Sequence, residues 1–114
     1  MATDIHAKLS NSSVSAQKVR LVIDLVRGKN AVQALSTLKL LTKSGAAPVY
    51  KLVASAVANA EENFGVSRED LYVYRIMADE APTRKWRRFG ARGRFKPMLR
   101  RSSHITVVLR ERAK

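Results

Sequence analysis

The sequence predicts an α+β fold, in which a small three-stranded antiparallel sheet packs on three helices and a long β-hairpin arm protrudes. Three segments with the composition or the alternation of strands, at residues 4–9, 71–77 and 103–109, predict the sheet. Apolar residues at helical spacing occupy the interval between the first two of these segments. An arginine-rich stretch with a central turn signal, residues 84–101, separates the last two strands and predicts the arm.

The N-terminal part of the chain predicts a strand followed by a helix. In the strand, Ile5, Ala7 and Leu9 alternate with polar residues. Ser15 is a candidate N-cap for the first helix, and Gly28 is placed to end it. The apolar residues between them recur at the i, i+3, i+4 and i+7 spacing of one buried helix face: Val19, Val22, Ile23 and Val26.

Two more helices are predicted before the second strand. Asn30 is the expected N-cap of the second, with Gln33 three residues later as in a capping box. Its apolar stripe comprises Ala31, Ala34, Leu35, Leu38 and Leu41. Ser44 is expected to cap a long, alanine-rich third helix that tolerates Pro48 in its first turn and ends at Gly65. The expected core positions of this helix are Val49, Leu52, Val53, Ala56, Val57, Ala60 and Phe64.

The arm is expected to extend well beyond the core. Its turn signal is Gly90-Ala91-Arg92-Gly93, about fourteen residues past Met77. At about 3.3 Å per residue these residues span about 45 Å, so only the base of the arm can rest on the core. We therefore expect a single domain, residues 1–114, with residues 78–102 forming the arm.

Positive charge is concentrated in the arm. The chain has a net charge of +13, and residues 84–101 supply nine of these charges because they contain no acidic residue. Such a cluster favours a polyanionic partner, with nucleic acid first and an anionic membrane surface second; a solvated charge run is the third interpretation. Arginine outnumbers lysine seven to two, which suits bidentate phosphate contacts. The basic residues are Arg84, Lys85, Arg87, Arg88, Arg92, Arg94, Lys96, Arg100 and Arg101.

Three aromatic residues lie among these cations. Trp86, Phe89 and Phe95 could stack on unpaired bases or pack across the hairpin; packing is favoured for Phe95 and stacking for Trp86. The chain lacks the sequence signatures of the common RNA-binding and DNA-binding modules, so recognition is expected to depend on phosphate contacts and shape. Duplex DNA remains an alternative to RNA.

Two charged groups outside the arm leave their roles open. Lys18, Arg20 and Arg27 are mixed with Asp24 on the exposed side of the first helix, which fits a solvated face and an RNA-facing patch equally well. The adjacent acids Asp79-Glu80 fit a solvated loop at the root of the arm and equally a negative collar that pairs with its arginines.

Catalytic and metal chemistry is poorly supported. The chain has no cysteine, which excludes disulfides, cysteine-type zinc sites and thiol catalysis. Its two histidines, His6 and His104, have no acid and nucleophile at catalytic spacing, and His104 is expected to form hydrogen bonds or contact phosphate. We therefore expect no enzyme activity, metal, cofactor or small-molecule substrate.

Membrane association is also not expected. The longest apolar run, around residues 49–60, is interrupted by Lys51, Ser55 and Asn59 and is too short to span a bilayer. The N-terminal residues lack the layout of a secretory signal or a transit peptide, so the chain is expected to remain where it is made.

Several motifs, in one order along nearly the whole chain, resemble those of the bacterial-type large-subunit ribosomal protein L-twenty-two family. They are Ser15-Ala-Gln-Lys-Val-Arg-Leu-Val, Asp24-Leu-Val-Arg-Gly-Lys29, Gln33-Ala-Leu35, Ser55-Ala-Val-Ala-Asn-Ala-Glu-Glu-Asn63, Asp79-Glu-Ala-Pro82, Gly93-Arg94 and Arg100-Arg-Ser-Ser-His-Ile-Thr-Val-Val108. The chain departs from the family pattern at Phe89-Gly90-Ala91, where Pro-Arg-Ala is common, and at Lys85-Trp86, where Lys-Arg is common.

The resemblance implies a structural role in the large ribosomal subunit of a cytoplasmic ribosome, with an organellar ribosome as the alternative. The implied partners are large-subunit ribosomal RNA, neighbouring ribosomal proteins and, at the hairpin tip in the exit-tunnel wall, the nascent polypeptide. The expected tip residues are Phe89, Gly90, Ala91, Arg92 and Gly93. The expected RNA-binding residues are Lys18, Arg20, Arg27, Lys29, Arg84, Lys85, Trp86, Arg87, Arg88, Arg92, Arg94, Lys96, Arg100, Arg101 and His104.

Overall fold

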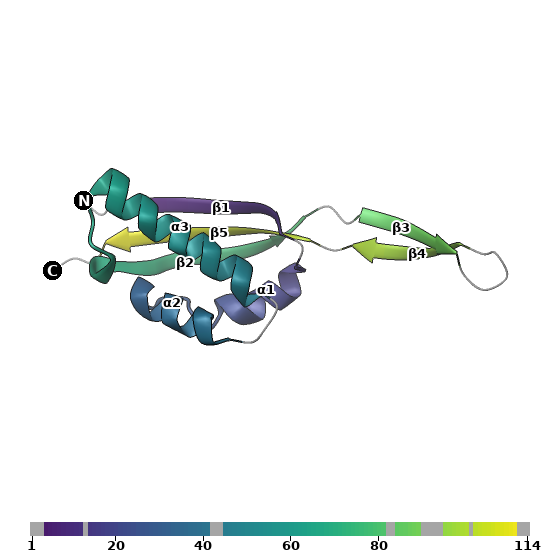
Figure 1. The fold of residues 1–114 in the computed structure, drawn as a ribbon, viewed down its shortest axis with the longest axis horizontal. Helices are drawn as coiled ribbons and strands as arrows, with labels where there is room; N and C mark the ends of the chain where they lie inside the picture. The colour runs from purple at the N-terminus through teal and green to yellow at the C-terminus, as the bar shows by residue number, and fades with distance from the viewer. Residues whose placement is uncertain are drawn as a thin grey trace.

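A computed structural model describes residues 4–12, 14–41, 45–81, 84–89, 95–100 and 102–111 of the chain. Figure 1 shows helices on a small sheet and a separate two-stranded arm, which confirms the predicted α+β class. The elements are β1 (Asp4–Ser12), α1 (Ala16–Ile23), α2 (Ala31–Leu40), α3 (Ala46–Phe64), the short 3₁₀ turn η1 (Arg68–Asp70), β2 (Leu71–Glu80), β3 (Arg84–Phe89), β4 (Phe95–Arg100) and β5 (Ser103–Glu111).

The three-stranded sheet has β5 at its centre, with β1 on one side and β2 on the other, all antiparallel. The register pairs Ile5 of β1 with Leu109 of β5, and Val107 of β5 with Ile76 of β2. These four side chains are at least 99% buried, because alternate residues of each strand face the helices. The predicted strands are therefore confirmed, and each runs a few residues longer than the sequence pattern indicated.

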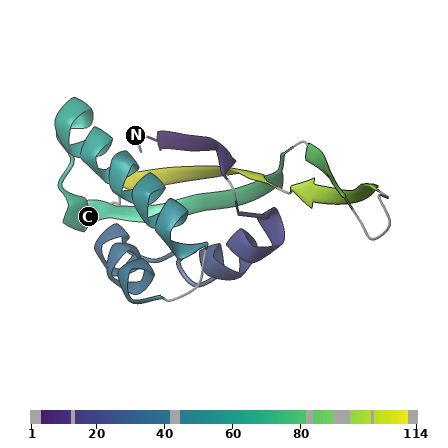
Figure 2. The same cartoon turned by 45° about the vertical axis from the view of Figure 1, so that its right-hand side comes forward.

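The helices complete one core on the inner face of the sheet. Helix α3 lies across β1 and β5, while α1 and α2 lie on the β2 side (Figures 1 and 2). The apolar stripe predicted for α1 is buried throughout. So are all the predicted core positions of α3 except Phe64.

Helix α1 ends earlier than Gly28 suggested. The α-helix stops at Ile23, and the chain continues in tighter turns in which the N–H groups of Leu25 and Val26 donate to carbonyls three residues back. Gly28 does have the left-handed backbone expected of it, with φ +80°. The reason for the early end is that the N–H of Gly28 donates to the Val73 carbonyl of β2 at 3.0 Å, so the chain must leave the helix to reach the sheet.

The other predicted helix boundaries are confirmed at Asn30 and Gly65, and in position but not in capping hydrogen bond at Ser15. Asn30 caps α2, its side-chain oxygen accepting the N–H of Val32 at 2.9 Å. Gly65 ends α3 with φ +64°. The N-cap of α3 is Gly45, whereas the predicted cap, Ser44, lies outside the described residues. Ser15 occupies the N-cap position of α1, but its side chain makes no capping hydrogen bond.

The prediction that Phe64 belongs to the core is wrong, because its side chain is 48% exposed. Phe64 continues the buried stripe of α3 by spacing alone. The last turn of the helix runs past the start of β1, however, where no sheet lies beneath it (Figure 1). Helical spacing therefore identifies the buried face of α3, but it does not show how far along the helix the sheet covers that face.

The arm is the antiparallel pair β3 and β4, which the structure describes by backbone and register. It points away from the three-stranded sheet and gives the molecule dimensions of 67 × 24 × 19 Å. A backbone hydrogen bond of 3.0 Å from Ala81 to the Ser102 carbonyl joins its two sides at the root. The hairpin predicted from the sequence is confirmed, while the predicted turn, Gly90-Ala91-Arg92-Gly93, lies outside the described residues.

Candidate nucleic-acid interface

The register of the arm sets basic residues directly opposite one another. Arg84 pairs with Arg100, and Arg88 pairs with Lys96. Like charges at opposed positions of a ladder destabilise it. A polyanion that lies along the arm would remove this repulsion, because each phosphate neutralises a basic residue and releases counterions. The arrangement therefore suits the binding of a phosphate backbone.

The register also positions the aromatic residues of the arm. Phe89 lies opposite Phe95 at the end of the ladder, and Trp86 lies opposite Met98. For the predicted RNA-binding residues of β3 and β4, the structure gives the position in the ladder: Arg84, Lys85, Trp86, Arg87, Arg88, Lys96 and Arg100. The remaining predicted residues of the arm and its tip lie outside the described residues, namely Gly90, Ala91, Arg92, Gly93, Arg94 and Arg101.

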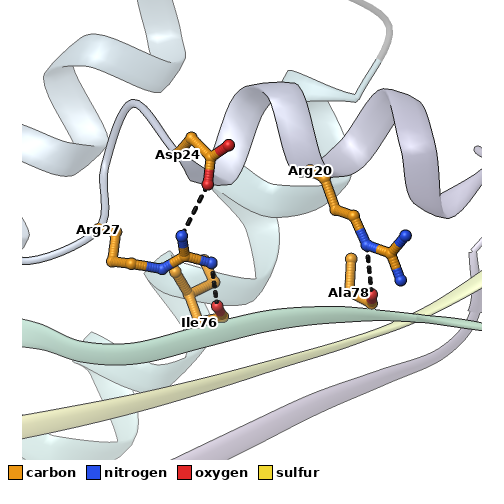
Figure 3. A network of polar contacts seen from close by, with 5 residues as sticks. All are labelled: Arg20, Asp24, Arg27, Ile76 and Ala78. Carbon is orange, nitrogen blue, oxygen red and sulfur yellow. Dashed lines mark hydrogen bonds and ion pairs between the residues drawn. The ribbon is translucent and has the colours of Figure 1, made fainter.

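Two of the predicted RNA-binding arginines contact the edge of the sheet. The Nε–H of Arg20 donates to the Ala78 carbonyl at 3.1 Å, and the Nη2–H of Arg27 donates to the Ile76 carbonyl at 3.0 Å (Figure 3). Arg27 also forms an exposed ion pair with Asp24 at 2.7 Å. Both guanidinium groups therefore have a structural role that the sequence did not reveal, since their partners are 58 and 49 residues away.

The rest of this edge of β2 is closed by the turn after α1. Val73 accepts the N–H of Gly28 at 3.0 Å and donates to the Lys29 carbonyl at 2.9 Å. Asn30 continues the contact as an isolated bridge to Tyr72, and its side-chain amide donates to the Glu69 carbonyl at 2.9 Å. Exposed strand edges are templates for pairing with other chains, and this edge is well covered.

Four basic residues that were predicted to bind RNA belong to α1 and the turn after it: Lys18, Arg20, Arg27 and Lys29. We call these four residues the α1 basic surface. All four side chains are exposed. Arg20 uses one of its five N–H donors in the contact with Ala78, which leaves the outer face of its guanidinium for a second acceptor. Arg20 and Arg27 lie along the same edge of β2 (Figure 3), and the prediction that Lys18 and Lys29 bind the same RNA as these two arginines stays a prediction.

The residues at the arm-side end of the sheet lie in strands. His104 is half-buried in β5, opposite Asp79 of β2, and Glu80 lies opposite Ser103. Of the two alternatives for Asp79 and Glu80, the solvated loop is wrong, because β2 pairs with β5 through both residues. They are exposed, and their pairing with arginines of the arm stays a prediction.

A charged cluster at the opposite end of the sheet was not predicted. The guanidinium of Arg110 donates to both carboxylate oxygens of Asp4, at 2.7 and 3.1 Å, and lies 3.5 Å from the centre of the Tyr74 ring. The hydrogen bond from Arg110 holds the pKa of Asp4 below its ordinary value. No local pattern indicates this contact, because it joins two residues 106 positions apart.

Within the part of the chain that the structure describes, no three His, Cys, Asp or Glu residues lie close enough together to hold a metal ion. None of the described helices is long and apolar enough to cross a membrane.

Comparison with known proteins identifies one family. Residues 7–110 match the family described as ribosomal protein L22p/L17e. Among curated proteins, the large ribosomal subunit protein uL22 of Pediococcus pentosaceus is 43% identical over 110 residues, which cover 96% of this chain and 93% of the relative. Proteins of the same name from two strains of Dehalococcoides mccartyi are 47% identical over 106 residues, covering 93% of this chain and 97% of each relative.

Proposed function

The chain belongs to the ribosomal protein L22p/L17e family, and from this membership we propose that it binds large-subunit ribosomal RNA through its arm and its α1 basic surface. As a member, it is a structural protein of the large ribosomal subunit and not an enzyme. Its expected partners are ribosomal RNA and neighbouring ribosomal proteins, in agreement with the resemblance seen in its motifs.

The observation that carries the proposal is the register of the arm. Arg84 lies opposite Arg100 and Arg88 lies opposite Lys96. These like charges repel across the ladder and destabilise the pairing of β3 with β4. A two-stranded ribbon is marginally stable alone. The arm therefore gains stability from phosphates along its length, and RNA binding and ordering of the arm are coupled.

The α1 basic surface supplies the second set of contacts. Lys18 and Lys29 are exposed and offer flexible ammonium groups, whereas Arg20 and Arg27 are fixed by their hydrogen bonds to β2. A fixed guanidinium loses less conformational freedom when it binds a phosphate. These four residues, with His104 near the root of the arm, position the globular part against RNA while the arm inserts into it.

The tip is proposed to form part of the wall of the nascent-peptide exit tunnel. The arm extends away from the three-stranded sheet along the 67 Å length of the molecule, which supports insertion into a surrounding RNA structure. The proposed tip residues are Phe89, Gly90, Ala91, Arg92 and Gly93.

The salt dependence of RNA binding tests the first part of the proposal. With about six to nine phosphate contacts, the logarithm of the affinity for large-subunit RNA should fall against the logarithm of salt concentration with a slope of about −4 to −8. A slope near −1 would contradict it. Equal affinity for duplex DNA, or retention on anionic vesicles in the presence of excess RNA, would favour the alternative partners.

Photocrosslinking in the assembled ribosome tests the second part. A photoreactive amino acid at Ala91 should form an adduct with a stalled nascent chain, and the same group at Lys39, on the exposed side of α2, should form none. If Ala91 formed adducts with RNA alone, the proposed place of the tip in the tunnel wall would be contradicted, while the RNA-binding proposal would stand.

A further inference from the structure

The two edges of the three-stranded sheet differ in how they are covered. The edge at β2 is closed by the turn after α1 and by Arg20 and Arg27. At the outer edge of β1, by contrast, the described residues form no hydrogen bond with the backbone of another element. Open edges of this kind accept an additional strand.

The pairing pattern identifies which residues of β1 offer their backbone groups outward. In an antiparallel ladder, the N–H and C=O of one residue point to the same side, and successive residues alternate. Val73 bonds away from β5, so its partner Leu109 points toward β1, where it meets Ile5. The alternate residues His6 and Lys8 therefore direct their backbone N–H and C=O groups away from the sheet.

A groove lies beside this edge, between β1 and the first half of α3. Its volume is about 480 Å³. Apolar side chains make up much of its lining, and Lys51 of α3 lies on it with no acidic residue among the described lining residues. The side chain of Lys8 alternates with Ala7 and Leu9, so it faces the other side of the sheet, where the residues next to an apolar one in an added strand would also point. The lining residues are Lys8, Leu9, Ser12, Ala47, Pro48, Lys51, Leu52 and Ser55.

We propose that an extended peptide segment of a partner protein pairs with β1 as a fourth strand and places an apolar side chain in this groove. Strand addition of this kind takes its affinity from main-chain hydrogen bonds and its specificity from pockets for alternate side chains. The lysines select acidic residues beside the apolar one. A peptide fits better than RNA, because the groove is largely apolar and lacks an aromatic ring on which a base could stack.

Selection from a displayed library of random nine-residue peptides tests the proposal directly. The full chain is the target, and the enriched peptides should combine a central apolar residue with flanking acidic ones. Binding of one enriched, fluorescently labelled peptide is then measured by anisotropy. Amide exchange of the complex should show slower exchange at His6 and Lys8, the two positions that point outward.

Substitutions separate strand pairing from charge. Lys8→Ala removes the ammonium group and keeps the backbone N–H, whereas Lys8→Pro removes both, and proline is tolerated on an outer strand edge. The proline variant should bind about fivefold more weakly than the alanine variant, the effect of one lost hydrogen bond. Lys51→Glu should weaken binding about fivefold, and the matched Lys39→Glu on α2 should leave it unchanged.

Three outcomes would overturn the proposal. One is that no peptide is enriched on the chain. Another is that the two Lys8 variants, confirmed as folded by thermal unfolding, bind the selected peptide equally. The third is that a uridine oligonucleotide displaces the peptide, loses affinity in Lys51→Glu and leaves exchange at His6 and Lys8 unchanged, which would make the groove an RNA site.

Discussion

Arg27 joins the turn after α1 to the outer edge of the sheet, because its Nη2–H donates to the Ile76 carbonyl of β2 at 3.0 Å. The same residue lies on the α1 basic surface. The Arg27 guanidinium thus stabilises the fold through its hydrogen bond to Ile76, while the side chain stays about half exposed. Its neighbour Lys29 contributes to the fold through its backbone carbonyl and extends an exposed ammonium group. These two cations should respond differently to substitution.

Replacing Arg27 should cost stability. Arg27→Ala removes a charge-assisted hydrogen bond to a strand edge, so the free energy of unfolding should fall by about 1–2 kcal/mol in urea titrations. The ion pair with Asp24 should contribute little to this loss, because it is exposed. A matched Asp24→Ala substitution should therefore leave stability nearly unchanged. Equal losses in the two variants would show that the contact with Ile76 is not the source.

Replacing Lys29 should reduce RNA affinity without reducing stability. Lys29→Ala keeps the backbone carbonyl that Val73 binds and removes the exposed charge. Unfolding in urea should be unchanged, and the slope of log affinity against log salt for large-subunit RNA should become shallower by about 1. Lys39→Ala on α2, outside the α1 basic surface, is the control and should keep the original slope. An unchanged slope in the Lys29 variant would exclude that residue from phosphate contact.

The predictions that succeeded depend on neighbours within a few residues. The Asn30 cap needs only the N–H of Val32, and Gly65 ends α3 through its own backbone angle, so both are visible in a short window of sequence. The strands were found from alternation and composition in the same way. Such signals are local by nature, and they also sufficed to place the hairpin between β2 and β5.

The features that were missed depend on contacts across the fold. Arg27 and Ile76 are 49 positions apart, and Asp4 and Arg110 are 106 apart. Nothing near any of these residues in the sequence indicates the partner. Phe64 was misplaced because helical spacing does not reveal how far the sheet extends under α3.

Gly45 should not tolerate a larger residue. A Cβ atom at this position would lie 3.3 Å from the Lys18 carbonyl oxygen and 3.3 Å from the Val19 Cα, both backbone atoms of α1. Because the φ of −76° is ordinary, Gly45→Ala would otherwise stabilise by restricting the unfolded chain. We expect instead a loss of about 1–2 kcal/mol in the free energy of unfolding, and a larger loss for Gly45→Val. An alanine variant as stable as the parent would show that the two helices can separate without cost.

The Asp4–Arg110 pair should make stability sensitive to acid. The hydrogen bond from Arg110 lowers the pKa of Asp4 in the folded state below its ordinary value of 3.8. A carboxyl group with a lowered folded-state pKa stabilises the fold above its unfolded pKa, and this stabilisation is lost as the pH falls through the folded pKa. Urea midpoints measured from about pH 6 to pH 2.5 should therefore fall less steeply for Asp4→Asn than for the parent.

Arg110→Gln should flatten the same part of the profile, and adding Asp4→Asn to it should produce no further change. A hydrogen bond from Ser67 lowers the pKa of Glu69, so this residue also contributes to the loss of stability in acid. Glu69→Gln should remove that contribution independently of Asp4. An Asp4→Asn profile parallel to that of the parent would show that Arg110 does not lower this pKa in solution.

Reversing one charge in the arm should stabilise the hairpin and weaken RNA binding at the same time. Arg88 lies opposite Lys96, so Arg88→Glu turns a repulsive cross-strand pair into an attractive one worth about 0.2–1 kcal/mol. In the protein without RNA, amide exchange in β3 and β4 should slow, while affinity for large-subunit RNA falls. Arg87→Glu is the matched control, because its partner Pro97 is uncharged: it should weaken RNA binding similarly and leave exchange unchanged. If both variants slowed exchange equally, the gain would come from the lower net charge of the arm and not from the Arg88–Lys96 register.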